Sequence, residues 1–207
     1  QASALSRQRA ADGVESVLTR DAIGQFPDQN VAESLRRLPG INILNDQGEG
    51  RFVSVRGLDP ELNAASVNGA RLPAPESDVR SVALDVVPSE LIESIEVKKS
   101  LTPDMDADTI GASIEINTTS AFDRKKDLYS VKLEGSYNDY SGEVTPKGSV
   151  DFSTRLTDSF GVSGGFSYYK RKFETDNIEA SDWTTSEDGI VYAETMEYRD
   201  YDVTRKR

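Results

Sequence analysis

Residues 128–138 read LYSVKLEGSYN, a stretch in which aromatic or aliphatic side chains alternate with polar ones. Alternation with a period of two places the apolar side chains on one face of a β-strand and the polar side chains on the other. Two further segments, residues 150–156 and 162–168, repeat the pattern after short turns. We therefore expect this half of the chain to form an antiparallel sheet with one apolar and one polar face.

Such a two-faced sheet has two interpretations. Segments of about ten residues with one apolar face and tight turns are typical of the strands of an outer-membrane barrel, whose apolar face meets lipid. The same segments also suit an ordinary antiparallel meander that covers a soluble core. The alternation by itself favours neither interpretation.

An acidic stretch follows these segments. Residues 174–202 contain ten Asp or Glu residues and one base, Arg199, with Trp183 and three tyrosines among them. This composition predicts a long acidic external loop at about residues 174–195, which leaves the third strand and returns through a fourth.

A run of four charges, RKKD at residues 124–127, separates the alternating segments from what precedes them. Charge runs are usually solvated connections, so we expect a domain boundary here. The sequence is thus divided into a first domain over residues 1–122 and a second over residues 123–207.

The first domain has short apolar runs separated by Gly and Pro, which is typical of a small mixed fold. Asn30 and Glu33 have the spacing of a capping box at the start of a helix that Pro39 ends. A shorter helix is expected after Thr19, ended by Gly24. Apolar runs predict the strands of one sheet beneath these helices, at residues 41–44, 52–55, 66–67, 95–97 and 114–118.

Composition excludes several classes of function. The 207 residues include 24 Lys or Arg and 36 Asp or Glu, for a net charge of −12, which argues against a nucleic-acid partner. The chain has no His and no Cys. Imidazole bases, thiol nucleophiles, disulfides and metal sites made from soft ligands are therefore excluded. We expect no enzyme activity, no catalytic residue and no cofactor.

Asp104, Asp106, Asp108 and Glu115 match the first, third, fifth and twelfth positions of an EF-hand calcium loop. Thr109 stands where that loop needs glycine, and a β-pattern follows, so a solvated turn is the stronger interpretation. The rival interpretation of the whole chain is a soluble periplasmic or secreted acidic module that binds calcium or cationic ligands.

Four blocks of the first domain resemble, in the same order, the plug domain of TonB-dependent outer-membrane receptors. They are FPDQNVAESLRRLPGI at 26–41, VSVRGL at 53–58, SVNGAR at 66–71, and IESIEVKK at 92–99 with IGASIEINT at 110–118. Several ordered blocks are far more specific than any single motif. The alternating strands also begin where the family's barrel begins. The resemblance implies an α+β plug domain, a small mixed sheet with short helices, followed by antiparallel β-strands of an incomplete transmembrane β-barrel.

The resemblance further implies a fragment of a transporter in the outer membrane of a Gram-negative bacterium. The plug would occlude the barrel lumen and gate the energy-coupled uptake of a solute. The implied partners are the TonB energy-coupling protein, outer-membrane lipid, and a small solute such as an oligosaccharide or a metal chelate. The TonB box is expected before residue 1, and the unusual segment 101–108 favours a carbohydrate or another non-iron nutrient.

The resemblance also implies two groups of site residues. Outward plug loops at residues 45–51 and 72–78, with the acidic loop, would contact the solute. The residues expected to make these contacts are Gln47, Glu49, Arg51, Glu76 and Trp183, the last by stacking on a flat ligand face. Arg56 and Lys99 are expected to anchor the plug to barrel glutamates, because an unpaired guanidinium facing a wall is costly.

Overall fold

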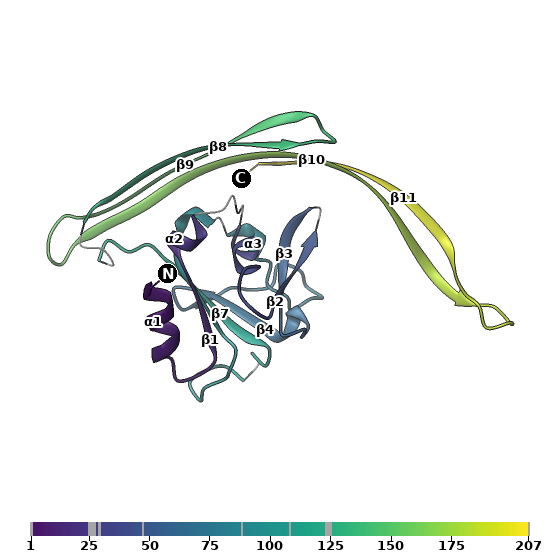
Figure 1. The fold of residues 1–207 in the computed structure, drawn as a ribbon, viewed down its shortest axis with the longest axis horizontal. Coiled ribbons are helices and arrows are strands. Elements are labelled where there is room, and N and C mark those ends of the chain that lie inside the picture. Colours follow the sequence, from purple (N-terminus) through teal and green to yellow (C-terminus); the bar gives the residue numbers. More distant parts are fainter. Residues whose placement is uncertain are drawn as a thin grey trace. The chain divides into compact units, whose positions relative to one another are not determined.

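The structure is a computed structural model, and it describes residues 2–24, 28, 30–46, 48–87, 89–107, 109–122 and 126–206. The contacts divide the chain into two compact units. One unit comprises Gln1–Ser130 with Val150–Phe166, and the other comprises Val131–Ser149 with Ser167–Arg207. Figure 1 labels the helices and strands.

The helices of the described residues are short. They are the α-helices α1 (Ala2–Ala10), α2 (Arg20–Ile23) and α3 (Val31–Leu35), and the 3-10 turns η1 (Pro60–Leu62), η2 (Leu84–Val86) and η3 (Ser89–Leu91). Helix α2 is the short helix expected after Thr19, although the Thr19 hydroxyl makes no capping hydrogen bond. Helix α1 was not expected from the sequence. In the part of the chain that the structure describes, no helix has the length and apolar character needed to cross a membrane.

The first unit is built on a five-stranded mixed sheet with the order β1-β6-β7-β4-β5. Its strands are β1 (Glu15–Thr19), β4 (Asn63–Val67), β5 (Ala70–Arg71), β6 (Ile92–Lys98) and β7 (Ala112–Thr118). Strand β4 runs parallel to β7, and the other neighbours are antiparallel. Strand β1, which the sequence analysis did not predict, forms one edge of this sheet.

Two of the expected strands lie outside this sheet. Strands β2 (Ile41–Asp46) and β3 (Glu49–Val55) pair with each other as a separate antiparallel hairpin. The expectation of a single sheet is therefore wrong. Because a tight turn lets β2 and β3 satisfy each other's backbone groups, neither strand needs the larger sheet.

Helix α3 begins as the sequence predicts. The side chain of Asn30 accepts a hydrogen bond from the backbone N–H of Glu33 at 3.1 Å, which confirms the cap. Val31 and Leu35 are fully buried in the main hydrophobic core of the first unit. The helix ends at Leu35, and a turn over residues 36–40 leads to β2, so the helix is shorter than expected.

The remaining strands form an antiparallel four-stranded sheet with the order β11-β10-β9-β8. They are β8 (Leu128–Asn138), β9 (Glu143–Arg155), β10 (Gly161–Thr185) and β11 (Val191–Lys206). Strands β10 and β11 keep one register from the pair Lys170 and Lys206 to the pair Thr185 and Val191.

The acidic segment is therefore strand and not loop over most of its length. The expected acidic loop at about residues 174–195 falls on β10, on a turn at residues 186–190, and on β11. In a two-stranded ribbon the side chains point to both faces, so acids can remain hydrated while the backbone pairs. Acidity thus predicted the solvation of this segment correctly but not its backbone structure. Its external position stays a prediction.

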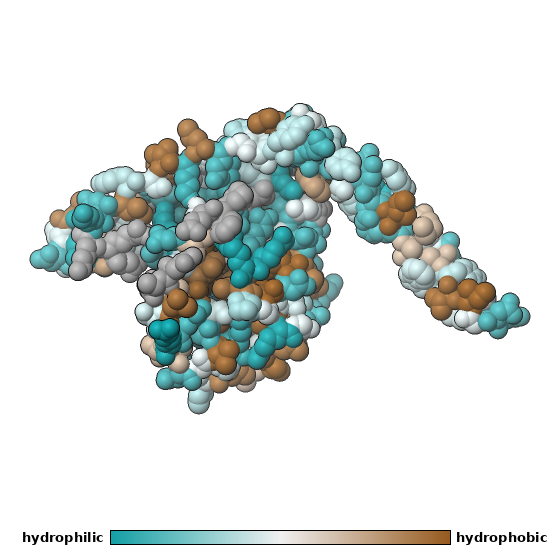
Figure 2. Space-filling view, viewed as in Figure 1, coloured by the Kyte–Doolittle hydropathy of each residue, from teal (hydrophilic) through white to brown (hydrophobic). Residues whose placement is uncertain are grey.

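The two faces expected for β8, β9 and β10 are present. The apolar side chains are exposed: Leu133 is 85%, Tyr129 72% and Val131 70% exposed. On β9 the polar side chains Ser149 and Ser153 are instead buried, with exposures of 4% and 3%. Figure 2 shows hydrophobic residues at the molecular surface. A soluble meander would bury the apolar side chains and expose the polar ones, so it is the poorer description of these strands.

Candidate functional site

The two plug loops that we expected to contact a solute meet at Arg51 in β3. One Nη atom of Arg51 lies 2.6 Å from the carboxylate of Asp46, the last residue of β2. The other lies 2.5 Å from the carboxylate of Glu76, in the second loop. The expected first loop is thus formed mostly by the ends of β2 and β3. The Cζ atom of Arg51 also lies 4.8 Å from the centre of the Phe52 ring. Arg51 thus joins the two loops through a fork of hydrogen bonds.

The local sequence explains how Arg51 reaches Asp46. Gly48 adopts a φ of +75°, a conformation that glycine tolerates without steric cost, and this allows the tight turn between β2 and β3. The strand register then places Asp46 opposite Glu49, at the base of the turn. The side chain of Arg51, two residues further along β3, reaches back to the carboxylate of Asp46.

The charges around Arg51 favour its cationic form. Burial lowers the pKa of Arg51, but the hydrogen bond that Arg51 donates to Asp46 and the charges of Glu76, Asp46 and Asp85 together raise the pKa above its usual value. Two carboxylates therefore bind one guanidinium, and this cluster carries a net negative charge. An anionic group that approaches Arg51 therefore meets two carboxylates that already bind the guanidinium.

Of the other three expected ligand contacts, the structure describes Glu49 and Trp183. The side chain of Glu49 is buried, with only 1% of the residue exposed, and is not presented to solvent. Gln47 lies outside the described residues. Trp183 is 64% exposed on β10, in the second unit. The structure thus brings together Arg51 and Glu76, and the ligand contacts proposed for all five residues stay predictions.

Arg56 and Lys99, the two expected anchors, form hydrogen bonds with groups of the first unit itself. Arg56 has a left-handed backbone, with φ of 56°, and its Nη2 donates to the carbonyl oxygen of Gly111 at 3.0 Å. Lys99 Nζ donates to Ser16 Oγ at 2.8 Å and to the carbonyl oxygen of Pro39 at 2.6 Å. Within the described residues, neither cation makes an ion pair with a carboxylate.

The electrostatics of Lys99 reflect this setting. The residue is 8% exposed, and burial lowers the pKa of Lys99. The neighbouring positive charge of Arg56 lowers this pKa further. Two neighbouring cations and a strained backbone at Arg56, which costs about 1 to 3 kcal/mol, are features typical of functional positions. Anchoring of the plug by Arg56 and Lys99 stays a prediction.

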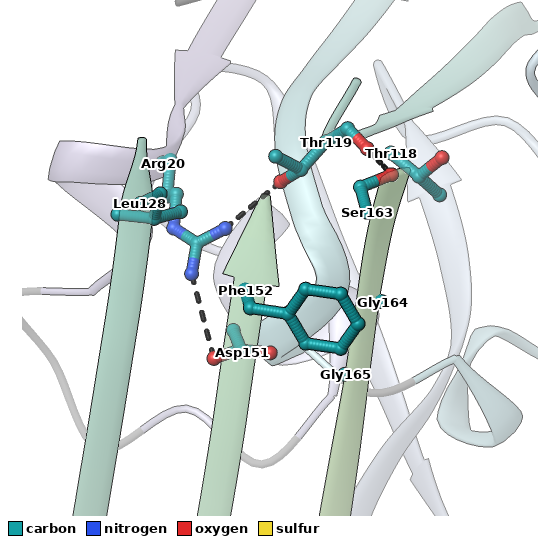
Figure 3. Close-up of a pocket in the computed structure, with 9 residues that line it drawn as sticks. All are labelled: Arg20, Thr118, Thr119, Leu128, Asp151, Phe152, Ser163, Gly164 and Gly165. Atoms are coloured by element: carbon teal, nitrogen blue, oxygen red, sulfur yellow. Dashed lines mark hydrogen bonds and ion pairs between the residues drawn. The ribbon is translucent and has the colours of Figure 1, made fainter. Parts of the chain in front are cut away.

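A third charged group, which the sequence analysis did not identify, connects α2 to β9 (Figure 3). Arg20 Nη1 donates to Thr119 Oγ1 at 2.8 Å, and Arg20 Nη2 lies 3.5 Å from Asp151 Oδ2. The side chains of Arg20 and Asp151 are only 17% and 6% exposed. A cavity of about 230 Å³ adjoins this group and is lined in part by Phe152 and Gly164. The signal in the sequence that could have identified this group was an acid, Asp151, on the polar face of β9.

The calcium interpretation receives no support from the geometry. Among the described residues, no group of three or more His, Cys, Asp or Glu side chains is placed to hold a metal ion. Asp108 lies outside those residues. Glu115 lies within β7, where its carboxylate accepts hydrogen bonds from the hydroxyl of Ser66 and the backbone N–H of Gly69. It therefore belongs to the sheet and not to a metal-binding loop.

Comparison with known proteins gives consistent matches. The family model of the TonB-dependent receptor plug domain matches residues 7–113, just over half of the 207-residue chain. The probable TonB-dependent siderophore receptor PirA of Acinetobacter baumannii is 26% identical over 171 residues, which cover 59% of this chain and 22% of that protein. The chain thus spans about a fifth of the length of this relative.

Solved structures show the same fold. The siderophore receptor PirA from Acinetobacter baumannii matches with a TM-score of 0.60 and 22% identity, over 78% of this chain and 25% of that one. The outer membrane transporter YddB from Escherichia coli matches with a TM-score of 0.55 and 17% identity, over 92% of this chain and 30% of that one. These matches confirm the predicted fold class, a plug with antiparallel barrel strands.

The family match rests on the same segments that the structure folds into one unit. The matched range includes strands β1 to β6, helices α2 and α3, and the start of β7. The chain therefore belongs to the TonB-dependent receptor plug-domain family, whose members are proteins of the bacterial outer membrane.

Proposed function

We propose that this chain is the plug and the first barrel strands of an outer-membrane transporter, in which the plug occludes the lumen and gates TonB-coupled uptake of a solute. In this proposal the plug comprises residues 1–122 and the barrel strands begin within residues 123–207. The observation that carries the proposal is the reversed burial on these strands: apolar side chains are exposed on both β8 and β9, and polar side chains are buried on β9.

The energetic cost of this reversal in water supports a lipid environment. Burial of one large apolar side chain away from water stabilises a protein by about 1.5 to 3 kcal/mol. Tyr129, Val131 and Leu133 on β8, and Phe166 on β10, are each at least 70% exposed. Lipid on that face would provide the missing burial, as it does for barrel strands. A soluble acidic module would leave these side chains in water.

The proposed action of the plug involves no bond chemistry. The relatives are receptors and transporters by name. We propose that this chain likewise lacks enzyme activity and acts by changing between a closed and an open plug. Force from the TonB protein would supply the energy for opening, and the solute would then pass.

We propose a small metal chelate as the solute. The named relative is a siderophore receptor, which supports a chelate over the carbohydrate suggested by residues 101–108. In this proposal an anionic oxygen atom of the chelate binds Arg51 in competition with Asp46 or Glu76, against the net negative charge of the cluster. Uptake of an oligosaccharide instead of a chelate would change the proposed solute class but not the proposed transport function.

Uptake by the complete receptor tests the proposal. The receptor is expressed in cells that lack their own siderophore receptors, and uptake of radiolabelled ferric chelates and of labelled oligosaccharides is measured with and without TonB. We expect TonB-dependent uptake of at least one chelate. Uptake that persists without TonB, or localisation of the receptor outside the outer membrane, would contradict the transport proposal.

A pair of variants tests the solute contacts. Arg51→Ala is expected to lower chelate uptake at least tenfold, because it removes the cation that joins the two plug loops. Arg71→Ala is the matched control, since Arg71 forms a more exposed ion pair with Asp106 in the same unit. Equal uptake by the two variants would remove Arg51 from the binding surface.

A further inference from the structure

The segment that follows β7 makes several contacts with the end of β9 and the start of β10. Ser163 Oγ donates to the carbonyl oxygen of Thr119 at 3.0 Å. Arg155 Nη2 donates to the carbonyl oxygen of Phe122 at 3.3 Å, and the Arg155 Cζ atom lies 5.0 Å from the centre of the Phe122 ring. Side-chain and backbone contacts thus bind the end of the plug to the start of the barrel strands.

Close packing reinforces these contacts at Gly161. A Cβ atom added to Gly161 would lie 2.5 Å from the Cβ atom of Ala121, which is closer than any real contact of this type. Ala121 is 8% exposed. The backbone of β10 therefore fits against the segment after β7 with no space for a side chain.

Arg20 extends this attachment to a second part of the plug. It belongs to α2, about a hundred residues before Thr119 in the sequence, yet it donates to Thr119 and reaches Asp151 on β9 (Figure 3). Since both members of the ion pair are largely buried, separating them would leave charges in an environment that stabilises them poorly. Helix α2 is thus bound both to Thr119, in the segment after β7, and to Asp151 on β9.

We propose that Arg20, Thr119, Phe122, Asp151, Arg155 and Ser163 form a clasp that stays closed while the plug opens, with Arg20 and Asp151 as its positioning residues. The plug would then open in its other parts, while α2 and the segment after β7 stay attached to the barrel strands. This inference rests on the proposed transport function, because only a transporter needs its plug to open.

An engineered disulfide tests whether the clasp opens. The chain has no cysteine of its own, so Thr119→Cys with Ser163→Cys introduces a single defined pair in this segment. The pair is introduced into the complete receptor, and oxidation is followed by the loss of maleimide labelling. We expect the oxidised and reduced receptors to take up ferric chelate at rates equal within twofold, because the joined backbones need not separate.

One outcome of this experiment would overturn the proposal. Uptake that falls at least tenfold on oxidation and returns on reduction would show that the clasp must open during transport. The single variants Thr119→Cys and Ser163→Cys are the controls for any effect of the substitutions themselves.

A second experiment addresses Arg20 and Asp151 and needs no known solute. Asp151→Asn and Arg20→Gln are expected to raise the leak of small antibiotics through the resting receptor at least threefold, because the plug is held less firmly. The exchange of the two charges, Arg20→Asp with Asp151→Arg, is expected to restore the low leak. An exchange that leaks as much as either single variant would exclude a role through pairing.

The readouts separate failure of the clasp from failure of the proposed function. Antibiotic leak reports on the clasp even when the unmodified receptor takes up no tested chelate. In that case the transport proposal would fail on its own experiment. Arg71→Gln is the control for leak, because it removes an arginine whose ion pair with Asp106 is exposed.

Discussion

The plug and the barrel strands place their apolar residues in opposite environments. In the plug, Leu35, Ile95 and Ile116 have no exposed surface. In β8, Val131 and Leu133 are 70% and 85% exposed. Residues of the same chemical type therefore meet different surroundings within one chain. Strands β7 and β8 both alternate apolar and polar side chains, so the two regions differ in the environment of the apolar face and not in its period.

The polar residues make the same comparison from the other side. On β9 Ser149, Asp151 and Ser153 are each at most 4% exposed, whereas the neighbouring Val150 and Phe152 are 49% and 40% exposed. The plug needs no lipid to bury its core, because the buried residues of its helices and strands pack on each other. We propose that lipid covers the exposed apolar side chains of the strands after residue 127, and this difference can be tested by substitution.

The largest expected effect is loss of packing in the plug core. Leu35→Ala removes three buried carbons from α3 and is expected to destabilise the plug by about 2 to 5 kcal/mol. Hydrogen exchange of plug amides in the complete receptor measures this loss. Leu133→Ala, the same change on β8, should leave plug exchange unaltered. Equal effects of the two variants on the exchange of plug amides would contradict the proposed difference between the plug core and a lipid-facing strand.

A charge on the apolar face of β8 is expected to have the next largest effect. Leu133→Arg should lower the stability of the refolded receptor in bilayers by about 2 to 4 kcal/mol near the bilayer midplane, and by less toward the interface. Glu134→Arg, on the opposite face of the strand, is the matched control. Reversible urea unfolding in vesicles measures both variants, and tolerance of Leu133→Arg would contradict lipid contact at this position.

Loss of the α3 cap is expected to have a smaller effect, confined to the plug. Asn30→Ala removes the acceptor for the Glu33 backbone N–H and should cost about 1 kcal/mol. Asn30→Ser, which keeps an acceptor, should recover most of this loss. Exchange rates of the amides in the first turn of α3 provide the measurement, and unchanged rates in Asn30→Ala would exclude a capping contribution.

Features set by neighbouring residues were predictable from the sequence, and features set by distant residues were not. The Asn30 cap joins residues three apart, and the two faces of β8 follow from its alternation. The contact of Arg20 with Asp151 joins residues 131 positions apart, and no local pattern reports it. Strand β1 was missed for the same reason, because its pairing with β6 needs residues 94–98.

The candidate site was predicted in part. The loops around Arg51 and Glu76 were identified by resemblance to a family, and the structure shows that these two residues meet. Their meeting was not foreseen, since an ion pair across 25 residues depends on how two loops fold together. The acidic segment at residues 174–195 was wrongly predicted to be a loop. Its charge indicates exposure to water but does not determine whether its backbone is paired.

The smallest expected effect concerns Lys99 and its pH dependence. Burial, with help from Arg56, lowers the pKa of Lys99 below its usual value of 10.5, so the folded plug disfavours the charged form. Between the lowered pKa and 10.5, the unfolded state binds more protons than the folded state. The stability of the plug should therefore rise with pH across this alkaline window. Below the window both states hold the proton, so Lys99 adds no pH dependence to the stability.

A comparison with Lys99→Met isolates that contribution. Methionine keeps most of the apolar length of the side chain but has no titrating group. The stability of the unmodified receptor relative to Lys99→Met should therefore rise with pH, and only within the alkaline window. Hydrogen exchange of plug amides at several pH values, corrected for the intrinsic rate, measures the difference. A barrel carboxylate that pairs with Lys99 in the complete receptor would raise the pKa and reverse the sign of the slope. The sign of the slope therefore distinguishes a lysine held only by Ser16 and Pro39 from one that anchors the plug to the barrel.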